Sequence, residues 1–131
     1  MKTVERADRT DALPAKILFY VSEDWFFASH FLPMARAARA MGLDVVVVTR
    51  IRNHAAVIAQ TGARLIALDI RRGALNPFGL WRDARRLAAI LRQERPVILH
   101  AIAMRGVLAG GLAARMAAVP RRVLAITGLG F

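Results

Sequence analysis

Cysteine is absent from the 131-residue sequence, and lysine is scarce: Lys2 and Lys16 are two of the 20 basic residues, so the other 18 are arginines. Without cysteine, the chain can form neither disulfides nor thiolate metal sites, and thiolate catalysis is excluded. Long apolar runs are missing too. The longest candidate, Gly106 to Val119, is interrupted by Arg115, whereas a bilayer-spanning helix needs about 20 unbroken apolar residues.

The short motifs of nucleotide and metal chemistry are also missing. No GxGxxG follows the first predicted strand, and neither GxxxxGK[ST] nor HExxH occurs. The three histidines, His30, His54 and His100, are too scattered for their spacing to predict a metal site. We therefore expect no metal ligands in this chain.

The composition is that of a folded domain, with 56% apolar and 22% charged residues. The net charge of +11 favours anionic partners, which include nucleic acid, acidic lipid headgroups and phosphorylated substrates. A genome rich in arginine and alanine codons would give the same surplus. Residues 1–14 mix both charges and contain no apolar run, so they predict a flexible leader rather than a signal peptide. We expect a cytoplasmic protein, at most peripheral at the inner face of the membrane.

The first structured stretch, Lys16 to Met41, organises the rest of the chain. Its apolar run Ile17 to Val21 is typical of a strand that is covered on both faces. A polar turn, Ser22 to Asp24, follows, and then a helix from about Phe26 to Met41. Pro33 lies inside this helix and should either kink it or delay its start.

The remaining sequence alternates between strands and helices, with no two strands adjacent. This alternation predicts an α/β fold, a doubly wound parallel sheet (Rossmann-like) over residues 15–131. The sequence stops on a glycine turn where a further helix is expected, which suggests an incomplete domain. The later strands are expected at Asp44 to Thr49, Arg64 to Asp69, Val97 to Ala101 and Val123 to Thr127, and the helices at His54 to Thr61, Phe78 to Glu94 and Gly106 to Ala118.

Polar side chains follow the first strand, at the sheet edge where α/β proteins bind their ligands. Ser22, Glu23, Asp24 and Trp25 are therefore candidate site residues. The alternative is that Ser22 and Asp24 only cap the following helix, because such side chains accept hydrogen bonds from its first free N–H groups.

Five further positions are candidates at the same edge. His100 lies at the carboxyl end of a predicted buried strand, and His30 lies in the first turns of the first helix. His100 could have a direct chemical role or be an ordinary core histidine, and His30 suits either a structural hydrogen bond or a substrate contact. Arg105 follows the fourth strand in an exit loop, Ile102 to Arg105, where it could clamp a phosphate or carboxylate, or form a rim salt bridge. Gly128 and Gly130 would permit close backbone approach to a ligand or to a further domain.

The helix Phe78 to Glu94, introduced by Asn76-Pro77, carries the densest basic charge. Such an amphipathic helix can lie on an anionic membrane, or it can be the solvated outer face of an α/β domain. Its candidate membrane-facing residues are Arg82, Arg85, Arg86 and Arg92.

Three sequence blocks in this order carry a resemblance. They are YVSEDWFFASHFLPMARAARAMGLDVVVVT, the NP-initiated arginine helix, and RPVILHAIAMRGVLAGGLAARMAAVPRRVLAITGLGF. Together, over residues 16–131, they resemble the amino-terminal domain of family 4 retaining glycosyltransferases of GT-B architecture. The most similar branch builds polysaccharides and lipid-linked glycans in bacteria.

The resemblance implies an enzyme of two domains, in which the amino-terminal domain holds the acceptor and the other holds the nucleotide sugar. Transfer would retain the anomeric configuration and need no metal and no cofactor beyond the nucleotide sugar as co-substrate. Preorganised positive groups and dipoles would stabilise the oxocarbenium-like sugar and the departing diphosphate. The acceptor-side residues implied here are Ser22, Glu23, Asp24, Trp25, His30, His100, Arg105, Gly128 and Gly130.

The sequence also departs from the family pattern. Ala101 and Ile102 stand where a second histidine is common, Arg105 where lysine is common and Gly106 where proline is common. The donor domain and its paired glutamates have no counterpart in the sequence. We therefore expect the chain alone not to catalyse transfer. The alternatives are a non-catalytic basic module for anionic lipid or nucleic acid, and a gene fragment without function. The aromatics do not interleave with the arginines, which disfavours a nucleic-acid stacking platform.

Overall fold

The computed structural model describes residues 14–69 and 76–126. Its five strands form one sheet in the order β3-β2-β1-β4-β5, and every neighbouring pair is parallel. The predicted doubly wound parallel sheet is thus confirmed. The elements are β1 (Lys16–Glu23), α2 (Asp24–His30), α3 (Leu32–Ala40), β2 (Asp44–Arg50), α4 (Ala55–Ala59), β3 (Arg64–Ala67), α5 (Pro77–Glu94), β4 (Ile98–Ile102), α6 (Ala103–Ala117) and β5 (Arg121–Ala125).

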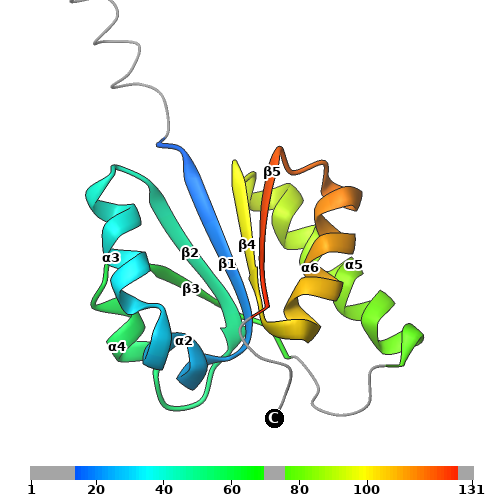
Figure 1. The fold of residues 1–131 in the computed structure, drawn as a ribbon, viewed down its shortest axis with the longest axis horizontal. Coiled ribbons are helices and arrows are strands. Elements are labelled where there is room, and N and C mark those ends of the chain that lie inside the picture. Colours follow the sequence, from blue (N-terminus) through cyan, green and yellow to red (C-terminus); the bar gives the residue numbers. More distant parts are fainter. Residues whose placement is uncertain (1–13, 70–75, 127–131) are drawn as a thin grey trace, which may run out of the picture.

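Helices cover both faces of the sheet, with α2, α3 and α4 on one face and α5 and α6 on the other (Figure 1). The alternating side chains of β1 explain why both faces are apolar. Leu18 and Tyr20 pack under α5 and α6, whereas Phe19 and Val21 pack under α2 and α3. Because β1 is buried on both sides, its sequence is the continuous apolar run Ile17 to Val21.

The first predicted helix is in fact two helices. α2 begins at Asp24, directly after β1, so the expected polar turn does not exist as a separate element. The break falls at Phe31, and Pro33 lies in the first turn of α3. Proline lacks the N–H that a continuous helix would need, but the first turn of a new helix does not use that group.

Three other boundaries differ from those expected. β4 continues to Ile102, and α6 begins at Ala103 without the predicted exit loop. β3 ends at Ala67 instead of Asp69. β5 begins at Arg121, two residues before the predicted start, because its hydrogen-bonded register with β4 extends over both arginines.

The ends of several helices follow local rules. The side chain of Asn76 accepts a hydrogen bond from the backbone N–H of Gly79 at 2.5 Å, which confirms it as the cap of α5. Gly42 follows Met41, the C-cap residue of α3, and has a φ of +87°, a conformation that glycine adopts without strain. Gly42 therefore explains why the helix stops here, close to the predicted end at Met41.

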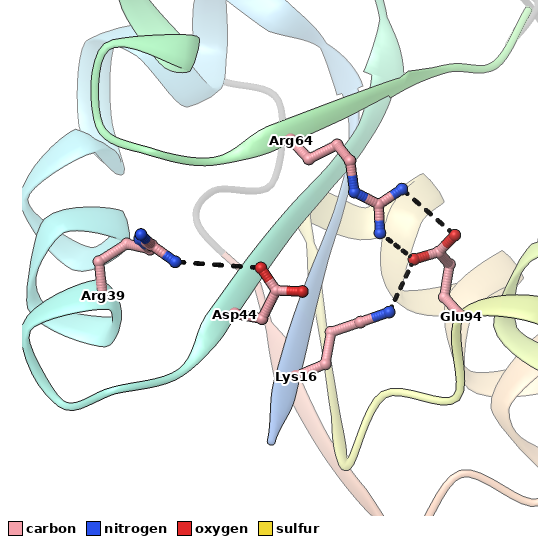
Figure 2. Close-up of polar contacts among 5 residues, drawn as sticks. All are labelled: Lys16, Arg39, Asp44, Arg64 and Glu94. Atoms are coloured by element: carbon pink, nitrogen blue, oxygen red, sulfur yellow. Dashed lines mark hydrogen bonds and ion pairs between the residues drawn. The ribbon is translucent and has the colours of Figure 1, made fainter. Parts of the chain in front are cut away.

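Glu94 ties the end of α5 to the sheet (Figure 2). Its carboxylate pairs with the Nζ of Lys16 at 2.9 Å and accepts two hydrogen bonds from the guanidinium of Arg64. The hydrogen bond from Arg64 outweighs the effect of partial burial and, with help from Lys16, lowers the pKa of Glu94. This cluster joins α5 to β1 and β3 at the amino edge of the sheet, away from the strand exits.

Candidate functional site

The switch point of this sheet lies between β1 and β4, the two strands from which the chain leaves toward opposite faces. After β1 the chain enters α2 on one face, and after β4 it enters α6 on the other (Figure 1). In open α/β sheets, ligands bind in the crevice outside the carboxyl ends of two such strands. The fold therefore places the candidate site at the edge formed by Glu23 and Asp24 on one side and the start of α6 on the other.

A bulge distorts β1 just before this edge. Tyr20 pairs with Val48 and Glu23 pairs with Arg50, so β1 has one more residue than β2 in the same interval. An extra residue of this kind redirects the side chains that follow it. The buried Glu23 consequently lies near the loop after β2, with its Oε2 3.7 Å from the Nε of Arg52.

Asp24 is fully buried and holds the loop after β2 in place. Its Oδ2 accepts hydrogen bonds from the backbone N–H of Arg52 at 2.8 Å and of His54 at 3.0 Å. Burial alone would raise the pKa of Asp24, but these hydrogen bonds and the nearby His54 outweigh it and lower that pKa. Neither Ser22 nor Asp24 caps α2, because Glu23 is the N-cap residue and no side-chain cap is present. The capping alternative is therefore wrong.

Trp25 and His30 lie on α2 and are both exposed. The ring of Phe26 contacts both of them, with centroids 5.7 Å from Trp25 and 4.7 Å from His30. Together the three rings form an aromatic surface on α2. Aromatic faces of this kind suit stacking against a sugar ring or an apolar chain.

His100 lies in the middle of β4 rather than at its end, and only 6% of its surface is exposed. Its ring packs between Phe19 and Phe31, with centroid distances of 5.1 and 5.9 Å. Burial lowers the pKa of His100, so the ring is neutral at pH 7. Its Nε2 is buried and makes no hydrogen bond with the described residues.

Arg105 lies in the first turn of α6, not in a loop. Its Nη2 is 3.0 Å from the Oδ2 of Asp83, and the Asp83 side chain is only 2% exposed. This ion pair joins α5 to α6 near Tyr20. The Tyr20 hydroxyl is buried and makes no hydrogen bond with the described residues. Burial and the Asp83 carboxylate raise the pKa of Tyr20, so the hydroxyl stays protonated.

The structure thus separates the predicted residues into two groups on the two sides of β1 and β4. Glu23, Asp24 and His100 lie on the side of α2 and α3 or at the strand exits, while Arg105 lies on the side of α5 and α6. Gly128 and Gly130 fall outside the described residues. Among the described residues, no group of three or more acidic or histidine side chains could hold a metal ion.

Four site residues were not predicted from the sequence. Arg52 and His54 follow β2 and could have been found, because the exits of parallel strands meet at one edge. Tyr20 carried no signal in an otherwise apolar strand. Ala103 has a φ of +66°, a left-handed conformation that strains a residue with a Cβ. Backbone strain at the β4–α6 junction cannot be read from an alanine in a sequence.

Solved structures share this fold at low sequence identity. A glycosyltransferase from Rickettsia africae ESF-5 superimposes with a TM-score of 0.68 at 15% identity, over 87% of this chain and 30% of that one. A putative UDP-N-acetylglucosamine 2-epimerase from Listeria monocytogenes gives 0.63 at 18% identity, over 86% and 31%. The S. aureus MnaA–UDP structure gives 0.64 at 20% identity, over 83% and 30%.

These structures establish a Rossmann-like fold shared with glycosyltransferases and epimerases, and the chain spans about 30% of the length of each. No curated protein sequence matches the chain. A family model matches residues 16–131, nearly the whole sequence, and its description is "Glycosyl transferase 4-like". The chain belongs to the glycosyl transferase 4-like family.

Proposed function

We propose that the chain is the acceptor-side domain of a retaining glycosyltransferase. The reaction would move a sugar from a nucleotide sugar to a polysaccharide or lipid-linked glycan. The family match over residues 16–131 supports the sugar-transfer class, and one solved structure of the same fold, that of S. aureus MnaA, contains UDP. Donor binding would belong to a second domain, so the chain alone is proposed to be inactive.

One observation carries the acceptor assignment. Two buried polar atoms on the strands that flank the switch point make no hydrogen bond with the described residues: the Tyr20 hydroxyl, on the face covered by α5 and α6, and the His100 Nε2, on the face covered by α2 and α3. A buried polar group that lacks a partner costs about 1–3 kcal/mol. Groups of this kind are retained where a ligand or an ordered water supplies the missing partner.

The assigned residues would divide the work by position. The exposed rings of Trp25 and His30 would stack on the acceptor, and Ser22 and Glu23 would hydrogen-bond to its hydroxyls. Asp24 would hold the loop that faces them. Arg105, Gly128 and Gly130 would line the side toward the second domain. The reaction develops positive charge on the sugar and negative charge on the diphosphate, so it needs groups that stabilise both charges. In the proposed division of roles, the groups that bind the diphosphate would belong to the donor domain.

Glycan binding and transfer should be measured separately. We expect the purified chain to show no turnover with a panel of UDP-, GDP- and dTDP-sugars and an array of bacterial oligosaccharides. Binding to one class of oligosaccharide on that array should persist. Trp25→Ala should weaken that binding at least tenfold, the loss of about 1.4 kcal/mol of stacking.

Trp81→Ala is the matched control, since Trp81 is similarly exposed, at 48% against 43% for Trp25, but lies on α5. It should bind glycans as the wild type does. Turnover by the chain alone would overturn the proposed inactivity. Equal loss of binding in the two tryptophan variants, or no binding to any glycan, would overturn the acceptor assignment.

A further inference from the structure

The outer face of α5 exposes two large aromatic side chains. Phe78 is 80% exposed and Trp81 is 48% exposed. The inner face of the same helix is fully used, because Ala84, Leu87 and Leu91 are buried in the core. Core packing therefore gives no reason for the two exposed rings.

Arginines share this outer face. Phe78, Trp81, Arg82 and Arg85 recur at helical spacing, so they form one stripe. Three arginines and both rings line a shallow hollow of about 400 Å³. The sequence suggested that aromatics do not alternate with arginines, but on this helix they do. The hollow is lined by Phe78, Trp81, Arg82, Arg85, Arg86 and Ala89.

No carboxylate of α5 balances these arginines. The helix has two acidic residues, and Asp83 is turned inward, where it pairs with Arg105. Glu94 lies at the far end and is engaged by Lys16 and Arg64 (Figure 2). The side chains of Arg82 and Arg85 make no hydrogen bond or ion pair with the described residues, so their charge is available to a partner.

Two of the arginines are fixed by backbone carbonyls. Arg86 donates to the carbonyl oxygen of Asp69 at 3.0 Å, and Arg92 donates to that of Met116 at 3.3 Å. Both keep their positive charge, because a carbonyl oxygen is neutral. The outer face of α5 thus combines a uniform positive charge with aromatic rings.

We propose that this face docks on an anionic lipid bilayer. Phe78 and Trp81 would lie at the boundary between headgroups and acyl chains, and Arg82 and Arg85 would bind lipid phosphates. The proposal goes beyond the sugar-transfer function and does not depend on it. Among the described residues, no helix is long and apolar enough to cross a membrane, so the contact is peripheral.

The shape of the face favours a bilayer over nucleic acid. α5 and α6 lie side by side on one face of the sheet (Figure 1), so α5 does not project as a helix that enters a major groove must. The first turn of α5, which carries Phe78, also lies toward the carboxyl edge of the sheet (Figure 1). Docking would therefore bring the candidate acceptor site close to the lipid surface.

Co-sedimentation with vesicles tests the proposal. The purified chain should bind vesicles of phosphatidylcholine and phosphatidylglycerol and leave pure phosphatidylcholine vesicles unbound. Each arginine at the surface contributes about 1 kcal/mol, so Arg82→Ala with Arg85→Ala should lower the partition coefficient about 30-fold. Trp81→Ala should also lower it, whereas Trp25→Ala should not.

The matched control is Arg36→Ala with Arg122→Ala. It removes the same charge from two exposed arginines outside α5 and should leave the partition coefficient at the wild-type value. Circular dichroism melting establishes that each variant is folded. Equal binding to both kinds of vesicle, or equal loss in the two arginine pairs, would overturn the proposal. So would binding of duplex DNA through Arg82 and Arg85 in a chain that ignores anionic vesicles.

Discussion

At the scale of single residues, Asp24 links the site to the fold. Its position after β1 suggested either a ligand contact or a helix cap. The structure instead uses its carboxylate to hold the backbone of Arg52 and His54, two residues that follow a different strand. A fully buried carboxylate is stable only when hydrogen bonds replace its lost hydration. Asp24 therefore fixes the distance between two strand exits at the candidate site.

Replacing Asp24 with asparagine should destabilise the protein by about 1–2 kcal/mol at pH 7, because hydrogen bonds to a charged acceptor are stronger than those to a neutral one. The folded-state pKa of Asp24 is lowered. Its contribution to stability is thus present above the unfolded pKa, about 3.9, and is lost as the pH falls through the folded pKa. Urea unfolding at several pH values measures how the free energy of unfolding depends on pH.

The deciding quantity is the difference in the free energy of unfolding between the wild type and Asp24→Asn. It should shrink in acid, where the wild-type carboxyl is also protonated and neutral. Other acid-sensitive groups such as Glu94 are common to both proteins and do not affect that difference. A difference that stays constant from neutral to strongly acidic pH would mean that the charge of Asp24 does not stabilise the loop.

At the scale of elements, helix α6 depends on small residues for its contact with β4. A Cβ at Gly110 would lie 2.7 Å from the Cβ of Ala101, closer than two such atoms can pack. A Cβ at the neighbouring Gly111 would meet no atom within 4 Å. Of these two glycines, only Gly110 is required by packing.

These two glycines give a matched pair of variants. Gly110→Ala should destabilise the protein by about 1–3 kcal/mol, because α6 must move away from β4. Gly111→Ala should stabilise it by about 0.5–1 kcal/mol, because alanine loses less backbone entropy in a helix. Thermal unfolding of both variants shows whether each one is more or less stable than the wild type. The close packing of α6 on β4 would be contradicted if the variants shifted the melting temperature in the same direction.

Local patterns predicted the elements better than their junctions. The apolar run of β1 and the Asn76-Pro77 helix start identified β1 and α5, because burial and capping depend on neighbouring residues. The start of α6 was misplaced, since Ala103 adopts a strained backbone that its residue type does not reveal. A salt bridge was one of the two roles expected for Arg105, but its partner was not predicted. Its partner Asp83 is 22 residues away, and only the packing of α5 on α6 brings them together.

At the scale of the whole molecule, the parallel sheet gathers its strand exits at one edge. That arrangement, with the switch point between β1 and β4, is what makes a single binding edge possible. The matched solved structures are about three times as long as this chain and share the fold alone. The family match over residues 16–131 supports the proposed sugar transfer, and the central claim of that proposal is that an acceptor glycan binds at this edge.

Chemical-shift mapping on the 15N-labelled chain tests that point most directly. Titration with an oligosaccharide selected on the glycan array should shift the amide signals of Glu23, Trp25, Arg52 and His54, which lie around the carboxyl edge. Signals from the outer face of α5, such as those of Trp81 and Arg85, should stay in place. Shifts confined to α5 or to the amino edge near Glu94 would contradict the assignment of the carboxyl edge as the acceptor site.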